Sequence, residues 1–188
     1  MINKIQSAET LVDRGIDATK AALCECRIRN LALKPHDKET TREQFRYAQA
    51  GLVYLKQTLG QTDANNHERR KNYLMSLYQQ ARLLYWHRTL ADRLRDEIRV
   101  GDTSDILQII GDEMEAARRS LKECEELSVE CGYPYMLLLV GNLCADMGDT
   151  KGSSLVQRAI DEMGEQDTRR IQQILDLHSL HSFKQPHN

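Results

Sequence analysis

The sequence predicts an all-α protein of about seven helices, in which a bundle of long helices continues into a short helical hairpin. Apolar residues recur three and four positions apart along most of the 188 residues, which is the spacing of one helix face. Aromatic residues make up only 5% of the chain, and it contains 3 prolines. Strand-like alternation with regularly spaced turn signals is absent from the sequence, which argues against a β-sandwich.

The first predicted helix spans about residues 2–33 and ends before Pro35, because proline disfavours helical geometry in the residue that precedes it. A second helix follows as far as Gly60. The stretch Thr40-Thr41-Arg42-Glu43 is typical of a capping box, in which the glutamate reaches back to the N-cap amide. We therefore expect the second helix to begin at one of these two threonines.

A third, long helix is predicted for about residues 67–100, and a fourth from about Thr103 to Gly132. The apolar stripe of the third helix is wide and drifts around the helix. We therefore expect this helix to be buried on two sides or to bend near His87.

The stretch Tyr133–Gly164 predicts a helix, a tight turn and a second helix. Pro134 occupies a first-turn position, where its missing N–H is not needed, and Gly148 is placed as the glycine that follows the first helix. Two helices this short bury too little apolar surface alone, so they must pack on neighbours.

A seventh helix is predicted to begin at about Thr168. Together the elements indicate a single all-α domain over residues 1–181, with a long-helix part at 1–100 and an acidic part at 101–181. A flexible tail is expected at residues 182–188.

Charge is unevenly distributed along the chain, although the net charge is only −2. Residues 66–100 carry eight Lys/Arg against four Asp/Glu, whereas residues 101–170 carry seven against fifteen. This asymmetry is typical either of surfaces that match each other within the molecule or of two surfaces for two partners.

The five cysteines have no repeated spacing, which argues against a disulfide framework. The first residues, MINKIQSAETLVDR, lack the apolar core of a signal peptide. None of the apolar runs reaches the roughly 18 residues that a membrane span needs. We therefore expect a reduced, cytoplasmic protein that does not associate with membranes.

The hairpin stretch resembles one unit of the tetratricopeptide repeat (TPR) family, which is built from helix–turn–helix units of about 34 residues. The family signature falls on Leu137, Val140, Gly141 and Cys144, then on the turn glycine Gly148, and then on Ser153, Gln157 and Ile160. The resemblance covers residues 134–167 as one degenerate unit, and Gln157 stands where the family has an aromatic residue. An ordinary helical hairpin with two glycines is the alternative interpretation.

The resemblance implies that the fold ends in a TPR-like hairpin with a partner-binding groove on its first helix. The implied lining residues, called here the predicted groove, are Tyr135, Leu138, Asn142, Ala145 and Asp146. In some family members an asparagine at the place of Asn142 holds a peptide with nearby lysines, but Leu138 stands where the usual lysine would be. The resemblance therefore implies general peptide or helix binding rather than carboxylate clamping.

The basic helix at residues 67–99 offers an alternative, because its cations are interleaved with aromatic residues. Such interleaving is how single-stranded nucleic acid is held by stacking and backbone contacts. The candidate residues are Arg69, Arg70, Lys71, Arg82, Trp86 and Arg88. The opposing interpretation places the aromatic residues in the core and pairs the arginines with the acidic part.

The sequence lacks Glu-x-x-His, His-Glu-x-x-His and Cys-x-x-Cys motifs, and we expect no catalytic residues, metal or cofactor. The sequence therefore predicts a non-enzymatic protein–protein interaction module, such as an adaptor, scaffold or regulatory subunit. It would bind a partner peptide or helix in a helical groove. Self-association through the long helices is a further expectation, and a small nucleic-acid-binding or regulatory subunit is the alternative function.

Overall fold

The computed structural model describes residues 2–34, 37–59, 67–95, 103–164 and 171, with side chains left undescribed at 2–16, 57–58, 67–69 and 103–111. All regular structure in this part of the chain is helical, as predicted. It holds six helices rather than the expected seven, because the expected last helix falls, apart from the buried Ile171, outside the described residues. Within the same part, every helix is too short or too polar to cross a membrane.

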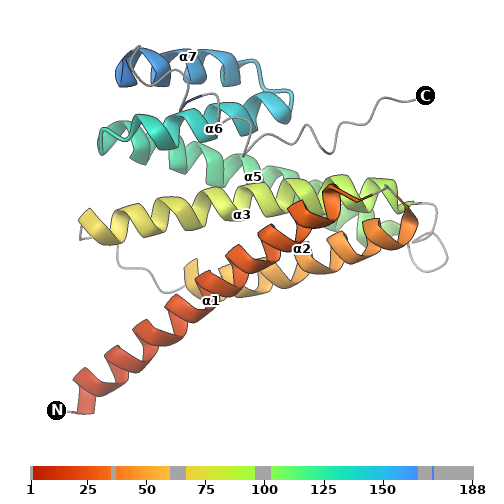
Figure 1. Ribbon diagram of the computed structural model, residues 1–188, viewed down its shortest axis with the longest axis horizontal. Coiled ribbons are helices and arrows are strands. Elements are labelled where there is room, and N and C mark those ends of the chain that lie inside the picture. The colour runs from red at the N-terminus through yellow and green to blue at the C-terminus, as the bar shows by residue number, and fades with distance from the viewer. Residues whose placement is uncertain (1, 35–36, 60–66, 96–102, 165–170, 172–188) are drawn as a thin grey trace. The chain divides into compact units, whose positions relative to one another are not determined.

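The helices are α1 (Ile2–Ala32), α2 (Lys38–Leu59), α3 (His67–Arg93), α5 (Thr103–Glu130), α6 (Pro134–Asp146) and α7 (Lys151–Met163) (Figure 1). Most of these bounds lie within two residues of the predicted ones. The expected C-terminal end of the third helix, near residue 100, lies outside the described residues.

The start of α2 differs from the prediction, because Asp37 rather than a threonine caps the helix. The Thr40 backbone N–H donates a hydrogen bond of 2.7 Å to Asp37 Oδ1, and the Thr41 side chain donates to the Asp37 carbonyl. The predicted capping box was therefore wrong: both threonines lie inside the first turn. The Thr40 amide, by donating to the Asp37 carboxylate, lowers the pKa of that group below its ordinary value.

The chain divides into two compact units, residues 1–117 and residues 118–188. The first half of α5 belongs to unit 1 and its second half to unit 2. The single domain over residues 1–181 stays a prediction, and the expected tail lies outside the described residues.

Unit 1 is built on the packing of α1 against α2 and of α2 against α3 (Figure 1). Gln44 on α2 donates a buried hydrogen bond of 3.2 Å to the Ile28 carbonyl of α1. The largest fully buried side chains of this unit are Trp86, Tyr78, Ile28, Leu55, Leu74, Leu83, Leu90 and Gln44. The wide apolar stripe of α3 is thus accounted for by burial in the core.

A buried ion pair joins α1 to α3 inside this core. The Arg82 guanidinium donates through Nε to Glu25 Oε1 at 3.1 Å, and through Nη2 to Glu25 Oε2. Burial disfavours the charged guanidinium, but the attraction and hydrogen bonds of Glu25 keep the pKa of Arg82 above its ordinary value. Arg82 also lies over the rings of Tyr78 and Trp86, 4.9 Å and 5.3 Å from their centroids.

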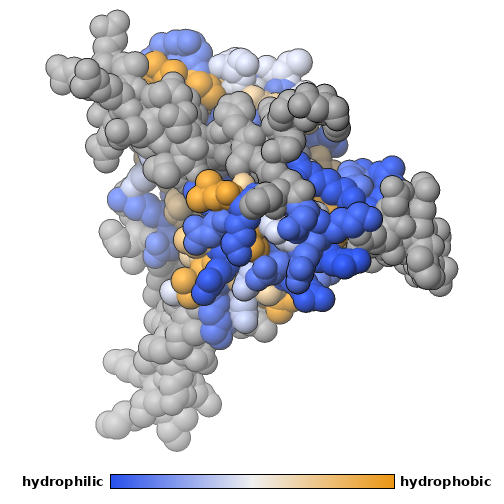
Figure 2. All heavy atoms as spheres, turned by 45° about the vertical axis from the view of Figure 1, so that its right-hand side comes forward, coloured by the Kyte–Doolittle hydropathy of each residue, from blue (hydrophilic) through white to orange (hydrophobic). Residues whose placement is uncertain are grey.

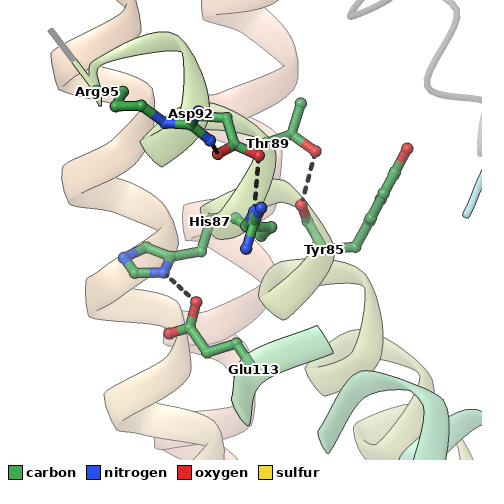
Figure 3. Close-up of polar contacts among 7 residues, drawn as sticks. Tyr85, His87, Thr89, Asp92, Arg95 and Glu113 are labelled. Atoms are coloured by element: carbon green, nitrogen blue, oxygen red, sulfur yellow. Dashed lines mark hydrogen bonds and ion pairs between the residues drawn. The ribbon is translucent and has the colours of Figure 1, made fainter. Parts of the chain in front are cut away.

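A second polar contact of unit 1 centres on His87, which lies on α3 between α2 and α5 (Figure 3). Its ring stacks on Phe45 of α2 with centroids 4.3 Å apart, and its Nδ1 donates to Glu113 Oε2 of α5 at 2.9 Å. His87 Nε2 is buried and has no hydrogen-bond partner in the described part of the chain. A bend near His87 was one of the two expectations for this helix, and the other, burial on two sides, agrees with the packed position of His87 in the core.

Unit 2 contains α6 and α7, which pack closely against each other (Figure 1). Gly141 of α6 and Gly152 of α7 lie where the two backbones meet: a Cβ on Gly152 would stand 2.4 Å from the Ala145 nitrogen and 2.6 Å from the Gly141 carbonyl oxygen. Glycine at both positions is what allows this close approach. The buried residues of α6 are Met136, Leu137, Leu138, Leu139, Val140, Gly141, Leu143 and Cys144, so α6 is covered on several sides.

Candidate partner-binding cleft

Hydrophobic side chains on the described surface do not form a broad patch on the face drawn in Figure 2, where they lie in small groups among hydrophilic residues. The coloured part of this face therefore shows small apolar groups and not one large patch. The candidate site is instead a small cleft in unit 2. We call it the unit 2 cleft.

The unit 2 cleft forms where the second half of α5, the end of α6 and the start of α7 come together, and has a volume of about 190 Å³. Its apolar lining consists of Leu121, Cys144, Met147 and Leu155. Three of these are buried and Met147 is half-buried. The cleft therefore has an apolar floor.

Charged side chains form the rest of the lining: Arg118, Lys122 and Glu125 from α5, and Asp149 and Lys151 from the α6–α7 turn and α7. All three cations are exposed. Arg118 and Lys122 are four residues apart and thus lie on one face of α5. An apolar floor with a charged rim is the usual composition of a protein-binding site.

The turn between α6 and α7 places Asp149 and Lys151 at this rim. Gly148 has a φ of 80°, and the Asp149 and Gly148 amides donate to the carbonyls of Cys144 and Ala145 at 2.9 Å and 3.0 Å. These two bonds form a Schellman motif, the helix ending in which a glycine such as Gly148 takes a positive φ. The sequence predicted this glycine at the end of the helix. Asp149 Oδ1 then accepts from the Lys151 backbone N–H at 3.0 Å and satisfies one free amide of the α7 N-terminus.

Cys144 is the nucleophile-type side chain in the cleft, and its surroundings keep it protonated. Burial, together with the nearby Asp149 and Glu125 carboxylates, raises its pKa to about 11. A thiol in this state is a poor nucleophile and a poor metal ligand at neutral pH. In the described residues, no group of three or more His, Cys, Asp or Glu side chains is placed to hold a metal ion.

The predicted groove is not an open surface. Its residues share one face of α6, but Leu138 is 0% exposed, whereas Tyr135 is 38% exposed and Ala145 is exposed. Asn142 and Asp146 are half-buried, and the Asn142 side-chain amide nitrogen is buried without a hydrogen-bond partner in the described part of the chain. Leu138 is therefore covered in this structure, and a groove on this face stays a prediction. Most residues of α6 are buried, and its exposed residues are Tyr135 and Ala145.

The buried face of α7 also lies one residue earlier than the repeat pattern places it. The pattern puts the helix contact at Ser153 and Gln157, both of which are exposed. The structure instead buries Gly152, Leu155 and Ala159.

The basic helix does not present all its candidate residues to solvent. Arg82 and Trp86 are each 2% exposed, so these two are core residues and not a surface for bases and phosphates. Arg88 donates to Asp92 on its own helix at 2.6 Å, and Asp92 also accepts from Arg95 (Figure 3). Arg70 and Lys71 are both half-buried, and the side chain of Arg69 lies outside the described part.

The buried Tyr78 and Trp86 agree with the interpretation that places the aromatic residues of this helix in the core. Arg82 pairs with Glu25 on α1, and Arg88 pairs with Asp92 on its own helix. A contact from α3 to the acidic part is made by His87, for which the sequence did not predict this role. Its place in the stripe with Leu83, Leu90 and Leu94 is the signal that could have identified it.

Comparison with protein-family models, curated proteins and solved structures gave no match in any of the three.

Proposed function

We propose that this protein is a non-enzymatic interaction module whose unit 2 binds a segment of a partner protein at the unit 2 cleft. The observation that supports this most is the combination of a buried apolar floor with exposed cations that have few partners. A core of desolvated apolar contact surrounded by polar groups is the arrangement that gives most of the binding energy in protein interfaces.

The size of the cleft favours a side chain over a small molecule. Sites for drug-sized ligands and cofactors have volumes of about 300–1,000 Å³. The cleft, at about 190 Å³, falls below this range. It suits one large side chain of a partner, inserted as an anchor, with the rest of the partner segment lying over the rim.

The chemistry of the cleft favours binding over reaction. The pKa of Cys144, raised to about 11, leaves a neutral thiol, and none of the described residues that line the cleft is a histidine able to act as its base. The lining cations are rim groups of the kind that set partner choice and association rate.

We also propose that α6, α7 and their turn form a single TPR-like hairpin that completes a bundle of longer helices. The Gly148 turn and Gly141 at the helix crossing support this, because the resemblance places the signature on both of these glycines. On α7 the crossing residue is Gly152, one position before the Ser153 of the repeat pattern. The binding site we propose is the unit 2 cleft and not the predicted groove, since Leu138 is buried. Self-association through the long helices stays a prediction.

The experiment is a comparison of partner capture by three forms of the full chain, expressed with an affinity tag in the source cell. The cleft variant carries Arg118→Glu and Lys151→Glu. The control variant carries Arg119→Glu and Arg158→Glu, which reverse two exposed cations of α5 and α7 that do not line the cleft. Both variants change the net charge equally.

Quantitative mass spectrometry should find a protein that the wild type and the control variant retain and that the cleft variant loses by at least about tenfold, which corresponds to about 1.4 kcal/mol. Helical circular dichroism of the three forms should be the same. If the cleft variant retains every protein that the control variant retains, the cleft is not the binding site and the proposal fails.

A further inference from the structure

The unit 2 cleft concentrates positive charge within an otherwise acidic stretch. Residues 118–164 contain five Lys/Arg and eight Asp/Glu. Three of the five cations line the cleft, namely Arg118, Lys122 and Lys151, but only two of the eight carboxylates do. The cleft is therefore the cationic part of a negatively charged stretch, which makes charge a means of choosing its occupant.

The cations are available to an occupant. Arg118 and Lys151 make no ion pair with any side chain in the described part of the chain, and Lys122 has a 3.8 Å contact with Glu126 in which both groups are highly exposed. Such an exposed pair contributes little and exchanges readily. The positive end of the α7 helix, at Lys151, adds to the attraction for a negative group.

The two carboxylates of the cleft do not cancel this charge equally. Asp149 already accepts a hydrogen bond from the Lys151 amide at 3.0 Å, so its charge is directed toward the α7 N-terminus. Glu125 is half-buried and lies one helical turn after the floor residue Leu121 and Lys122 on α5. It would repel an extended polyanion more than a short acidic segment, because a polyanion cannot keep its charges away from the cleft floor.

Resting on the proposed function, we propose that the occupant is a partner segment in which one large apolar side chain is flanked by aspartate or glutamate residues. The apolar side chain enters the floor formed by Leu121, Cys144 and Leu155, and this contact supplies most of the affinity. The flanking carboxylates lie against Arg118 and Lys151. Since exposed pairs are individually weak, the carboxylates contribute selectivity and association rate more than affinity.

The test is a selection of random linear peptides, displayed on phage, against the immobilised full chain. The selected peptides should share a leucine, isoleucine, methionine or phenylalanine next to acidic residues. A synthetic peptide of the selected sequence, labelled for fluorescence anisotropy, should bind the cleft variant at least about tenfold more weakly than the wild type. It should bind the control variant with unchanged affinity, and replacing its apolar residue with serine should abolish measurable binding.

Three other outcomes separate the inference from the function on which it rests. Peptides that lack acidic residues but still depend on the cleft would overturn the acidic occupant and leave the interaction module standing. Equal competition by a single-stranded oligonucleotide would also overturn it, because the recognised group would then be any polyanion. Peptides that bind the wild type and the cleft variant equally would show that the cleft is not a binding site, and both proposals would fail.

Discussion

The helices inside unit 1 and the helices inside unit 2 are held together by different kinds of contact. In unit 1, α1 and α3 are joined by long side chains that carry a buried ion pair, Arg82 with Glu25, next to the rings of Tyr78 and Trp86. In unit 2, α6 and α7 meet at Gly141 and Gly152, where the absence of side chains lets the backbones touch. The core of unit 1 depends on two buried charges that must remain paired, and the helix contact of unit 2 depends on glycines that carry no side chain.

This difference teaches that the units fail for different reasons. A buried charge that loses its partner keeps its full desolvation cost, so unit 1 is sensitive to any change that removes one member of the pair. A close helix crossing has no flexible side chain to move aside, so unit 2 is sensitive to added volume. The substitutions that matter should therefore be subtractive in unit 1 and additive in unit 2.

The largest effect is expected from Arg82→Met in unit 1. Methionine keeps an apolar chain beside Tyr78 and Trp86 but leaves the Glu25 carboxylate buried without its partner, which should lower the free energy of unfolding by about 3–5 kcal/mol. Chemical denaturation followed by tryptophan fluorescence measures this, because Trp86 is the single tryptophan.

Two further variants test whether the ion pair is the cause. Arg88→Met removes a partly exposed pair on the same helix and should cost less than about 1 kcal/mol. Adding Glu25→Met to Arg82→Met removes both buried charges and should restore much of the lost stability. A double variant no more stable than Arg82→Met alone would contradict this explanation.

A smaller effect is expected from Gly152→Ala in unit 2. The added methyl group would stand 2.4 Å from the Ala145 nitrogen, which belongs to helix backbone, so α6 and α7 must move apart at a cost of about 1–3 kcal/mol. Hydrogen exchange of the α6 and α7 amides measures the loss. Ser153→Ala, at the exposed neighbouring position, should change stability by less than about 0.5 kcal/mol, and a similar loss in both variants would remove the crossing as the cause.

The smallest effect is expected from protonation of an aspartate at the start of a helix, Asp37 before α2 in unit 1 and Asp149 before α7 in unit 2. Asp37 caps α2 and has a lowered pKa, because the Thr40 amide donates to its carboxylate. A carboxyl group whose folded pKa lies below its unfolded value, about 3.9, stabilises the fold above that value and loses this contribution as the pH falls through the folded pKa. Acidification below about pH 4 should therefore speed exchange of the Thr40 amide relative to its intrinsic rate.

Asp37→Asn is the matched control for this pH effect. Asparagine offers a capping oxygen that does not titrate, so the exchange of the Thr40 amide should lose its dependence on pH. If the acid-induced exchange persists unchanged in this variant, another group is responsible. Asp149 holds the Lys151 amide of α7 in a similar way, so the same measurement on α7 compares the two caps.

The helices of both units could be predicted from the sequence because their signals are local. The spacing of apolar residues placed all six described helices, and Pro134 and Gly148 marked the bounds of α6 closely. The start of α2 was misplaced because Asp37 and Thr40 both have side chains that cap helices, and the threonine pattern was the more familiar one. Local competition of this kind shifts a boundary by two or three residues and leaves the helix in place.

The candidate site was predicted less well, because exposure depends on what lies opposite each helix face. The resemblance implied a groove along the face of α6 with Tyr135 and Asn142, yet Leu138 on that face is fully buried. The continuous apolar run from Met136 to Val140 was the signal that this part of the helix is buried all round.

By itself, the sequence determined the helical class, the position of each described helix and the turn at Gly148, since each follows from residues within one or two turns of one another. Only the tertiary structure decided that Arg82 meets Glu25, 57 residues away, and lies in the core rather than on a basic surface. It also decided that Arg118, Lys122 and Lys151 border one cleft. Side chains far apart in the chain become neighbours only through helix packing, and periodicity within a helix carries no information about which helix lies opposite.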